Sequence, residues 1–104
     1  MKAILIPVKG KAKIIEISGD TVGEQLKSLQ EAVGGHITTV TISSDACLIC
    51  DDEGVLKGKP LNAQASMLGA PIVGDVLIVG VGEDDFTDVP EPMIEMMKER
   101  FKIL

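Results

Sequence analysis

Two lysines near the middle of the chain have the clearest potential for chemistry. Lys57 and Lys59 stand just before a short predicted helix, and Asn62 is of the residue type that caps such a helix. The free N–H groups and the dipole of a helix start attract anions, so two ammonium groups beside it predict an anion or nucleotide site. The predicted ligand-binding residues are Lys57, Lys59, Asn62 and Ser66, joined by Lys9 and Lys11 if the turn of the first hairpin lies nearby. The alternative interpretation is two solvated lysines and an ordinary helix cap.

A second candidate surface is an acidic stretch that follows the most apolar strand of the chain. It contains Glu83, Asp84, Asp85 and Asp88, whose spacing does not fit a calcium loop. We interpret it as a solvated loop, with an acidic partner-binding surface over residues 83–91 as the alternative. Because carboxylates can also mimic the phosphates of DNA, the same loop supports a rival function for the protein, as a protein–protein inhibitor or a DNA mimic.

The two cysteines have the C-x-x-C spacing of redox and zinc sites. A redox dithiol needs its first cysteine at a helix N-terminus, where the pKa of the thiol falls, but Cys47 and Cys50 fall in a predicted strand and point to opposite faces. A zinc site needs four ligands, and only His36 and Asp51 or Asp52 lie close enough in sequence to complete one. We therefore interpret the pair as buried structural thiols, with metal or redox use as the alternative.

No group of residues forms a catalytic constellation. His36 is the only histidine, and it follows a helix end, where it is expected to cap helix carbonyls or face solvent. Without a histidine partner, the serines and threonines have no evident base, which argues against a nucleophilic triad. Gly80 and Gly82 follow a strand but lack the third glycine of a dinucleotide loop, so they predict a turn. We predict a protein that is not an enzyme and that uses no cofactor and no metal.

Length and composition limit the partners. The chain of 104 residues predicts one domain, 1–104, with a core that needs no disulfides. Aromatic residues are only 2% of the chain, so stacking of nucleic-acid bases has almost no platform. The net charge of -6 argues against nucleic acid and against an anionic membrane. Without a signal peptide or a membrane-spanning run, we expect a cytoplasmic protein, in the host cytoplasm if a phage encodes it.

The first half of the chain predicts a hairpin, a helix and a second hairpin. Apolar, β-branched runs predict strands over residues 2–8 and 12–17 and, after the helix, over 36–42 and 46–50, with Val55 and Leu56 resuming the pairing briefly. Thr21 and Glu24 have the spacing of a capping box, and the helix ends at Gly34. Its apolar stripe consists of Val22, Leu26, Leu29 and Val33. The order predicts an α+β fold with a β-grasp-like mixed sheet, in which the third strand lies parallel to a neighbour.

The second half adds a short helix, a buried strand and a closing helix. We predict the short helix over residues 62–68, a strand over 76–81 that is buried on both faces, and a final helix that starts at Pro90. The apolar side of the final helix carries Met93, Ile94, Met96, Met97, Phe101 and Leu104. We interpret its methionines as core residues, with a contact between copies in a homo-oligomer as the alternative.

Residues 57–87 carry a resemblance to a known family. The matching positions are Gly34-Gly35, Gly58, Pro60, Asn62, Ala65, Gly74-Asp75, the 76–80 strand and Phe86-Thr87. This pattern resembles family 3846 of the domains of unknown function, small proteins of bacteriophages, plasmids and other mobile elements. The resemblance covers most of the chain and implies an accessory protein, one that interferes with host defence. It implies no activity and no catalytic residue.

Three functions are therefore carried forward. The first is a non-catalytic, homo-oligomeric binding protein that holds an anionic, nucleotide-like ligand and thereby sequesters a host defence signal. The second is a protein–protein inhibitor or DNA mimic that acts on a host protein through the acidic 83–91 loop. The third is a structural accessory domain with neither activity.

Overall fold

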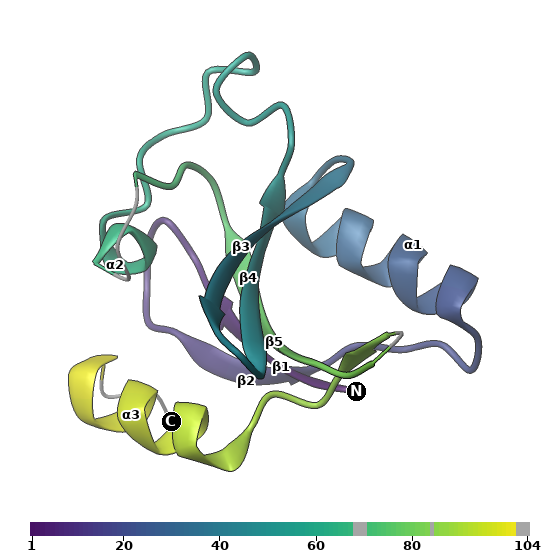
Figure 1. Cartoon of the computed structure of the whole chain (residues 1–104). Coiled ribbons are helices and arrows are strands. Elements are labelled where there is room, and N and C mark those ends of the chain that lie inside the picture. Colours follow the sequence, from purple (N-terminus) through teal and green to yellow (C-terminus); the bar gives the residue numbers. More distant parts are fainter. Residues whose placement is uncertain (68–70, 84, 102–104) are drawn as a thin grey trace.

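Within the described residues, the helices and strands follow one another in nearly the predicted order (Figure 1). The computed structural model describes residues 1–67, 71–83 and 85–101. The elements are β1 (Lys2–Ile6), β2 (Lys13–Glu16), α1 (Val22–Val33), β3 (Ile37–Ser43), β4 (Ala46–Asp51), α2 (Ala63–Ser66), β5 (Val76–Val81), β6 (Phe86–Thr87) and α3 (Glu91–Phe101). The predicted α+β class is confirmed. Strand β6 is an addition, because the acidic stretch was expected to be a loop throughout.

Strand β5 lies at the centre of the sheet, between the two hairpins that precede it in the chain. The strand order is β2-β1-β5-β4-β3, with β6 paired to the end of β5, and every pair among the described strands is antiparallel. The expected parallel neighbour for the third strand is therefore wrong. The physical reason is that β5 occupies the place between the hairpins, so β3 is displaced to the edge, where it pairs with β4.

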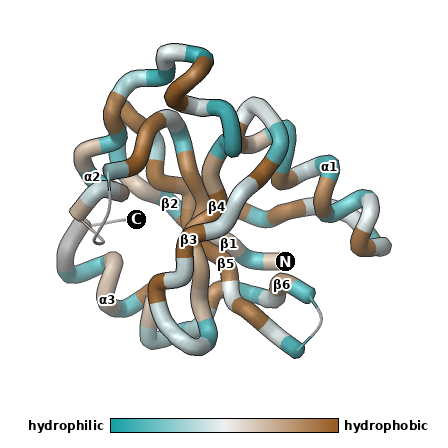
Figure 2. The backbone as a smooth tube through the Cα atoms, turned by 45° about the horizontal axis from the view of Figure 1, so that its top comes forward, coloured by the Kyte–Doolittle hydropathy of each residue, from teal (hydrophilic) through white to brown (hydrophobic). Residues whose placement is uncertain are grey.

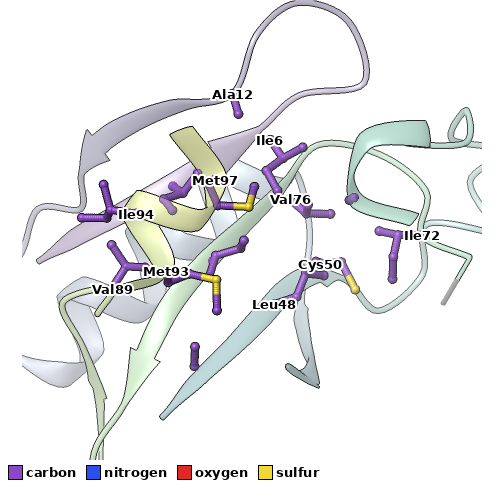
Figure 3. Close-up of a cluster of buried hydrophobic side chains, with 14 residues drawn as sticks. Ile6, Ala12, Leu48, Cys50, Ile72, Val76, Val89, Met93, Ile94 and Met97 are labelled. Carbon is purple, nitrogen blue, oxygen red and sulfur yellow. The ribbon is translucent and has the colours of Figure 1, made fainter. Parts of the chain in front are cut away.

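The side chains of β5 alternate between two hydrophobic cores, one on each face of the sheet. Val76 and Ile78 lie in the core that α3 covers, whereas Leu77 and Val79 lie in the core that α1 covers. Figure 3 shows the first of these cores, where Met93 and Met97 of α3 pack over Leu48 and Val76. Figure 2 shows hydrophobic residues concentrated along the central strands. The predicted burial of β5 on both faces is confirmed.

The closing helix and the cysteines contribute buried side chains to these cores. Met93, Ile94 and Met97 are buried and Met96 is partly buried, which confirms the interpretation of these methionines as core residues. The described part of the chain does not include Asp84, Leu104 or the side chain of Phe101. Cys47 and Cys50 are buried in opposite cores, as the strand pattern predicts.

Helix α1 begins and ends where its sequence signals place it. The side chain of Thr21 accepts a hydrogen bond from the backbone of Glu24, whose own side chain accepts from the cap backbone, so the capping box is confirmed. Gly34 ends the helix at φ 81°, a left-handed conformation that favours glycine. Among the described helices, none is long and apolar enough to cross a membrane.

Asn62 ties three segments together inside the protein. Its side-chain amide is fully buried and donates to the carbonyl oxygens of Ile6 and Gly74, at 2.9 Å each. Its oxygen accepts from the backbone N–H of Ala65 at 3.0 Å and so caps α2. The predicted cap is confirmed, and the same side chain also fixes β1 to the turn that leads into β5.

We expect Asn62→Ala to destabilise the fold. The substitution removes all three buried hydrogen bonds of the Asn62 side chain and leaves the N–H of Ala65 without its capping partner, and a buried group that loses its partner costs about 1–3 kcal/mol. Urea denaturation should therefore show a free energy of unfolding lower by at least about 1–3 kcal/mol. Gln64→Ala is the matched control, because the Gln64 amide also bonds backbone carbonyls but lies only partly buried. Equal losses in the two variants would contradict a special role for Asn62.

Candidate functional site

Asp51 binds both of the lysines that were predicted to hold an anion. Its side chain is 1% exposed, and its Oδ2 lies 2.8 Å from the Nζ atoms of Lys57 and of Lys59. Its Oδ1 accepts from the backbone N–H of Glu53 at 2.9 Å. The hydrogen bonds from Lys57, Lys59 and Glu53 hold the pKa of the Asp51 carboxyl well below its usual range. The two ammonium groups therefore already have an anionic partner within the protein.

The same two lysines bind the end of α1. The Nζ of Lys57 donates to the carbonyl oxygen of Gly34 at 3.1 Å, and the Nζ of Lys59 donates to that of Val33 at 2.6 Å. Helix α1 has no basic residue in its own last turn. Cations at a helix C-terminus satisfy its free carbonyls and offset the negative end of the dipole. Lys57 and Lys59 thus supply from a later loop the charge that α1 lacks.

This cluster also shapes the loop that follows β4. Backbone hydrogen bonds within the loop join Lys57 to Glu53 at 2.9 Å and Lys59 to Gly54 at 3.0 Å. Val55 and Leu56 lie at the exposed outer side of this turn. The expectation that these two residues resume strand pairing is wrong, because the lysines draw the loop back onto the end of α1.

The other predicted ligand-binding residues lie in a different part of the fold. The hydroxyl of Ser66 bonds the backbone N–H and carbonyl of Ile72, at 2.9 and 3.3 Å. The side chain of Gln64 donates to the carbonyls of Pro7 and Gly10, at 3.0 and 2.9 Å. This contact places the first hairpin's turn, with exposed Lys9 and Lys11, beside α2, as the prediction required. The six residues thus form separate sets, and none of them lines the cavity described next.

A cavity of about 310 Å³ lies between α1 and the β5–β6 hairpin. Its helix side consists of Val22, Gln25, Leu26 and Leu29, and its hairpin side of Val81, Gly82, Glu83, Asp85 and Phe86. We call this surface the α1–β6 groove. Its volume is at the lower end of the range for ligand pockets, about 300–1,000 Å³. Most of its walls are hydrophobic, and two exposed acidic residues, Glu83 and Asp85, are part of the lining.

The groove lies where the first half of α1 faces the β5–β6 hairpin without packing closely against it. The second half of the helix is buried through Leu29 and Val33, whereas Val22 is 61% exposed and Leu26 is 39% exposed. In Figure 1 the first half of α1 projects beyond the strands. Two residues of the predicted apolar stripe therefore face a hollow instead of the core. Large hydrophobic side chains exposed together mark binding surfaces more often than single ones do.

The opposite wall is fixed by contacts around the β5–β6 turn. Gly80 pairs with Thr87, and a side chain at Gly80 would collide with the backbone of Asp88, so only glycine fits. The carboxylate of Asp88 accepts from the backbone N–H of Lys2 at 2.8 Å, which anchors the hairpin to β1. Val81 nevertheless remains 40% exposed. The wall is thus rigidly attached while its hydrophobic surface stays open.

The acidic residues divide into anchored and exposed groups. Asp88 is engaged with β1, and Asp84 lies outside the described residues. Glu83 and Asp85 are exposed and line the groove. The acidic surface that the sequence offered as an alternative therefore adjoins a hydrophobic hollow, which the sequence pattern did not predict. The apolar stripe marked the hydrophobic side of α1, but nothing in it distinguishes exposed Val22 and Leu26 from buried Leu29 and Val33.

The remaining candidate residues lie away from the groove. Burial raises the pKa of the Cys47 and Cys50 thiols, which disfavours the reactive thiolate. The side chain of His36 is exposed, and its backbone carbonyl accepts from Asp52 N–H at 2.8 Å.

Comparison with known proteins gives a family without an activity. A family model described as "Domain of unknown function (DUF3846)" matches residues 1–102. Searches among curated proteins and among solved structures gave no match. The description names no substrate, ligand or partner, so the chemistry of the described residues has to support any functional proposal.

We expect Asp51→Asn to lower thermal stability at neutral pH and to change its dependence on pH. Folding lowers the pKa of Asp51 from the ordinary aspartate value of about 3.9, so its carboxylate stabilises the fold fully above about pH 4. That contribution is lost as the pH falls further through the folded value. The melting temperature of the variant should lie several degrees below wild type at neutral pH, and the difference should shrink below about pH 4.

Asp52→Asn is the control for this experiment. Asp52 is the exposed neighbour, so its substitution removes the same charge without touching the lysines. Differential scanning fluorimetry from neutral to acidic pH should show little change for it. A difference between Asp51→Asn and wild type that stays constant down to about pH 3 would argue against the ion pairs as its source.

Proposed function

The chain belongs to the DUF3846 family, and we propose that it is a non-catalytic binding protein that takes a basic, hydrophobic segment of another protein into the α1–β6 groove. One observation carries the proposal: the exposed hydrophobic side chains of α1 and β5 face one hollow that two exposed acidic residues also line. A protein segment with a leucine-like side chain beside a lysine or arginine matches both features. The function is thus the acidic-surface alternative, with the hydrophobic groove added to it.

The groove favours a peptide over a DNA-mimic role. A DNA mimic needs carboxylates spaced along an extended surface, in the place of phosphates. Here the described carboxylates at the groove are Glu83 and Asp85, and most of the remaining wall is hydrophobic. Binding sites for protein segments typically combine a hydrophobic anchor with a charged rim, where the rim adds specificity and speeds association.

Charge supports a basic partner more than an anionic ligand. The net charge of -6 attracts cations over the whole surface. Lys57 and Lys59, the residues predicted to bind a nucleotide-like anion, share their ammonium groups with Asp51 and with the end of α1. The anionic-ligand function stays a prediction, and its test is a thermal-shift screen with nucleotides and cyclic nucleotides. A ligand that binds only the folded state must raise the melting temperature.

Peptide selection tests the proposed function. Random-peptide phage display on the purified protein should enrich sequences that combine leucine, isoleucine, phenylalanine or methionine with lysine or arginine. A synthetic peptide of the enriched sequence should bind about tenfold or more weakly to Leu26→Glu, which places a charge in the hydrophobic wall. The double variant Glu83→Lys, Asp85→Lys should weaken the same peptide by about tenfold, because two exposed ion pairs are lost and two repulsions are gained.

Glu31→Lys is the matched control. Glu31 is an exposed acidic residue of the same helix, and it does not line the groove. Charge reversal at Glu31 changes the net charge as much as either Glu83→Lys or Asp85→Lys alone. Because Glu31 lies outside the groove, the variant should leave peptide affinity nearly unchanged. The proposal fails if no hydrophobic, basic sequence is enriched, or if Glu31→Lys weakens binding as much as the two rim substitutions.

A further inference from the structure

We propose that β3 is the strand through which two copies of this chain join, edge to edge and antiparallel, around a two-fold axis at Thr39. The sheets of the two copies would then form one continuous sheet. This inference goes beyond the proposed function. It concerns the edge of the sheet at β3, and no residue of β3 lines the α1–β6 groove.

The two edges of the sheet are protected to very different degrees. Strand β2 is four residues long and carries Lys13 and Glu16, and Glu16 binds the N-terminal ammonium group at 2.8 Å. Strand β3 is seven residues long, and its sequence ITTVTIS contains no charge and no proline. Natural proteins block open edges with short strands, lysines or prolines. The edge at β2 has two of these features, whereas the edge at β3 has none of them and departs from regular pairing only at its end, between Thr41 and Ser43.

The outward backbone groups of β3 follow from its pairing with β4. In an antiparallel pair, successive residues alternate between bonding the neighbouring strand and facing away from it. His36 accepts from Asp52 across this pair, and Thr38 and Val40 follow His36 at steps of two. These residues therefore bond β4, and Ile37, Thr39 and Thr41 turn their N–H and C=O groups to the open edge. Within the described part of the chain, the sheet has no strand on that side.

Only one two-fold symmetric register pairs all three outward residues of one copy with the same three residues of the second copy. With the axis at Thr39, Thr39 pairs with Thr39 of the second copy, and Ile37 pairs with its Thr41. Every outward N–H and C=O then finds a partner, which gives six hydrogen bonds across the axis. Cross-strand threonine pairs stabilise such contacts. Ile37, Val40 and Ile42 are only partly buried in one copy, so the pairing would also cover hydrophobic surface.

A second copy meets no like charge along this edge. Strand β3 is uncharged over Ile37–Ser43, and the ammonium group of Lys57 near its start is already bound to Asp51 and Gly34. Antiparallel pairing with an identical strand therefore places no two like charges directly opposite one another.

Two charge variants at one exposed position test the axis. Thr39→Lys and Thr39→Glu each place two like charges directly opposite one another across the proposed axis. Light scattering with size-exclusion chromatography should show wild type as a dimer at high concentration and each variant alone as a monomer. An equimolar mixture of the two variants should restore a dimer that contains one copy of each, because the introduced ammonium group of one copy then faces the introduced carboxylate of the other. Native mass spectrometry identifies that heterodimer once one variant is labelled with ¹⁵N, because lysine and glutamate differ too little in mass to separate the dimers otherwise.

Circular dichroism of each variant verifies the fold, which an exposed side chain at residue 39 should leave intact. Wild-type protein that is monomeric at every concentration, or that forms assemblies without a defined size, overturns the proposal. So does a dimer that persists in Thr39→Lys alone. A mixture that stays monomeric overturns the axis at Thr39.

Discussion

Strand β5 has hydrophobic side chains on both faces, and the need to bury both faces determines how the other elements are arranged. A strand of this kind needs neighbours along both edges and a layer over each face. The two hairpins supply the neighbours, β1 and β4. Helix α1 covers Leu77 and Val79, and α3 covers Val76 and Ile78. The position of β3 at an open edge follows from the same arrangement, because β5 takes the place between the hairpins.

The electrostatics of the surface depend on a single buried carboxylate. Asp51 draws Lys57 and Lys59 onto the end of α1, so two of the few cations act inside the structure. Among the described residues, Glu83 and Asp85 beside the β5–β6 turn form no such ion pair, and the carboxylate of Asp88 bonds the backbone of Lys2. The exposed acidic residues beside the groove therefore keep their charge for a partner, which is why a basic partner suits this surface.

Local signals in the sequence predicted the helices and strands well, whereas the features that sequence reasoning missed depend on long-range contacts. The capping box at Thr21 and the glycine at residue 34 act within one helix, and both are confirmed. The alternation in β4, which separates Cys47 from Cys50, is local as well. The association of Asp51 with two lysines joins a strand end, a loop and a helix end. The clue was the absence of any basic residue from the last turn of α1.

The α1–β6 groove shows the same difference between local signals and long-range contacts. The apolar stripe from Val22 to Val33 predicted which side of α1 would be hydrophobic, but not over what length the helix would pack against the sheet. That length depends on β5 and β6, which lie about fifty residues later in the chain and could not be measured from the helix. The stripe alone predicts burial along its whole length, although only its second half is buried.

The order of the strands also has a consequence for folding during synthesis. Each hairpin, β1–β2 and β3–β4, consists of neighbouring segments and can form as soon as it leaves the ribosome. Neither can join the other until residues 76–81 have been made, since β5 alone bridges them. Two separate hairpins with unpaired edges therefore precede the finished sheet, and hairpins of this kind are marginal in water. The nascent chain must therefore carry hydrophobic strands without their partners until β5 has emerged from the ribosome.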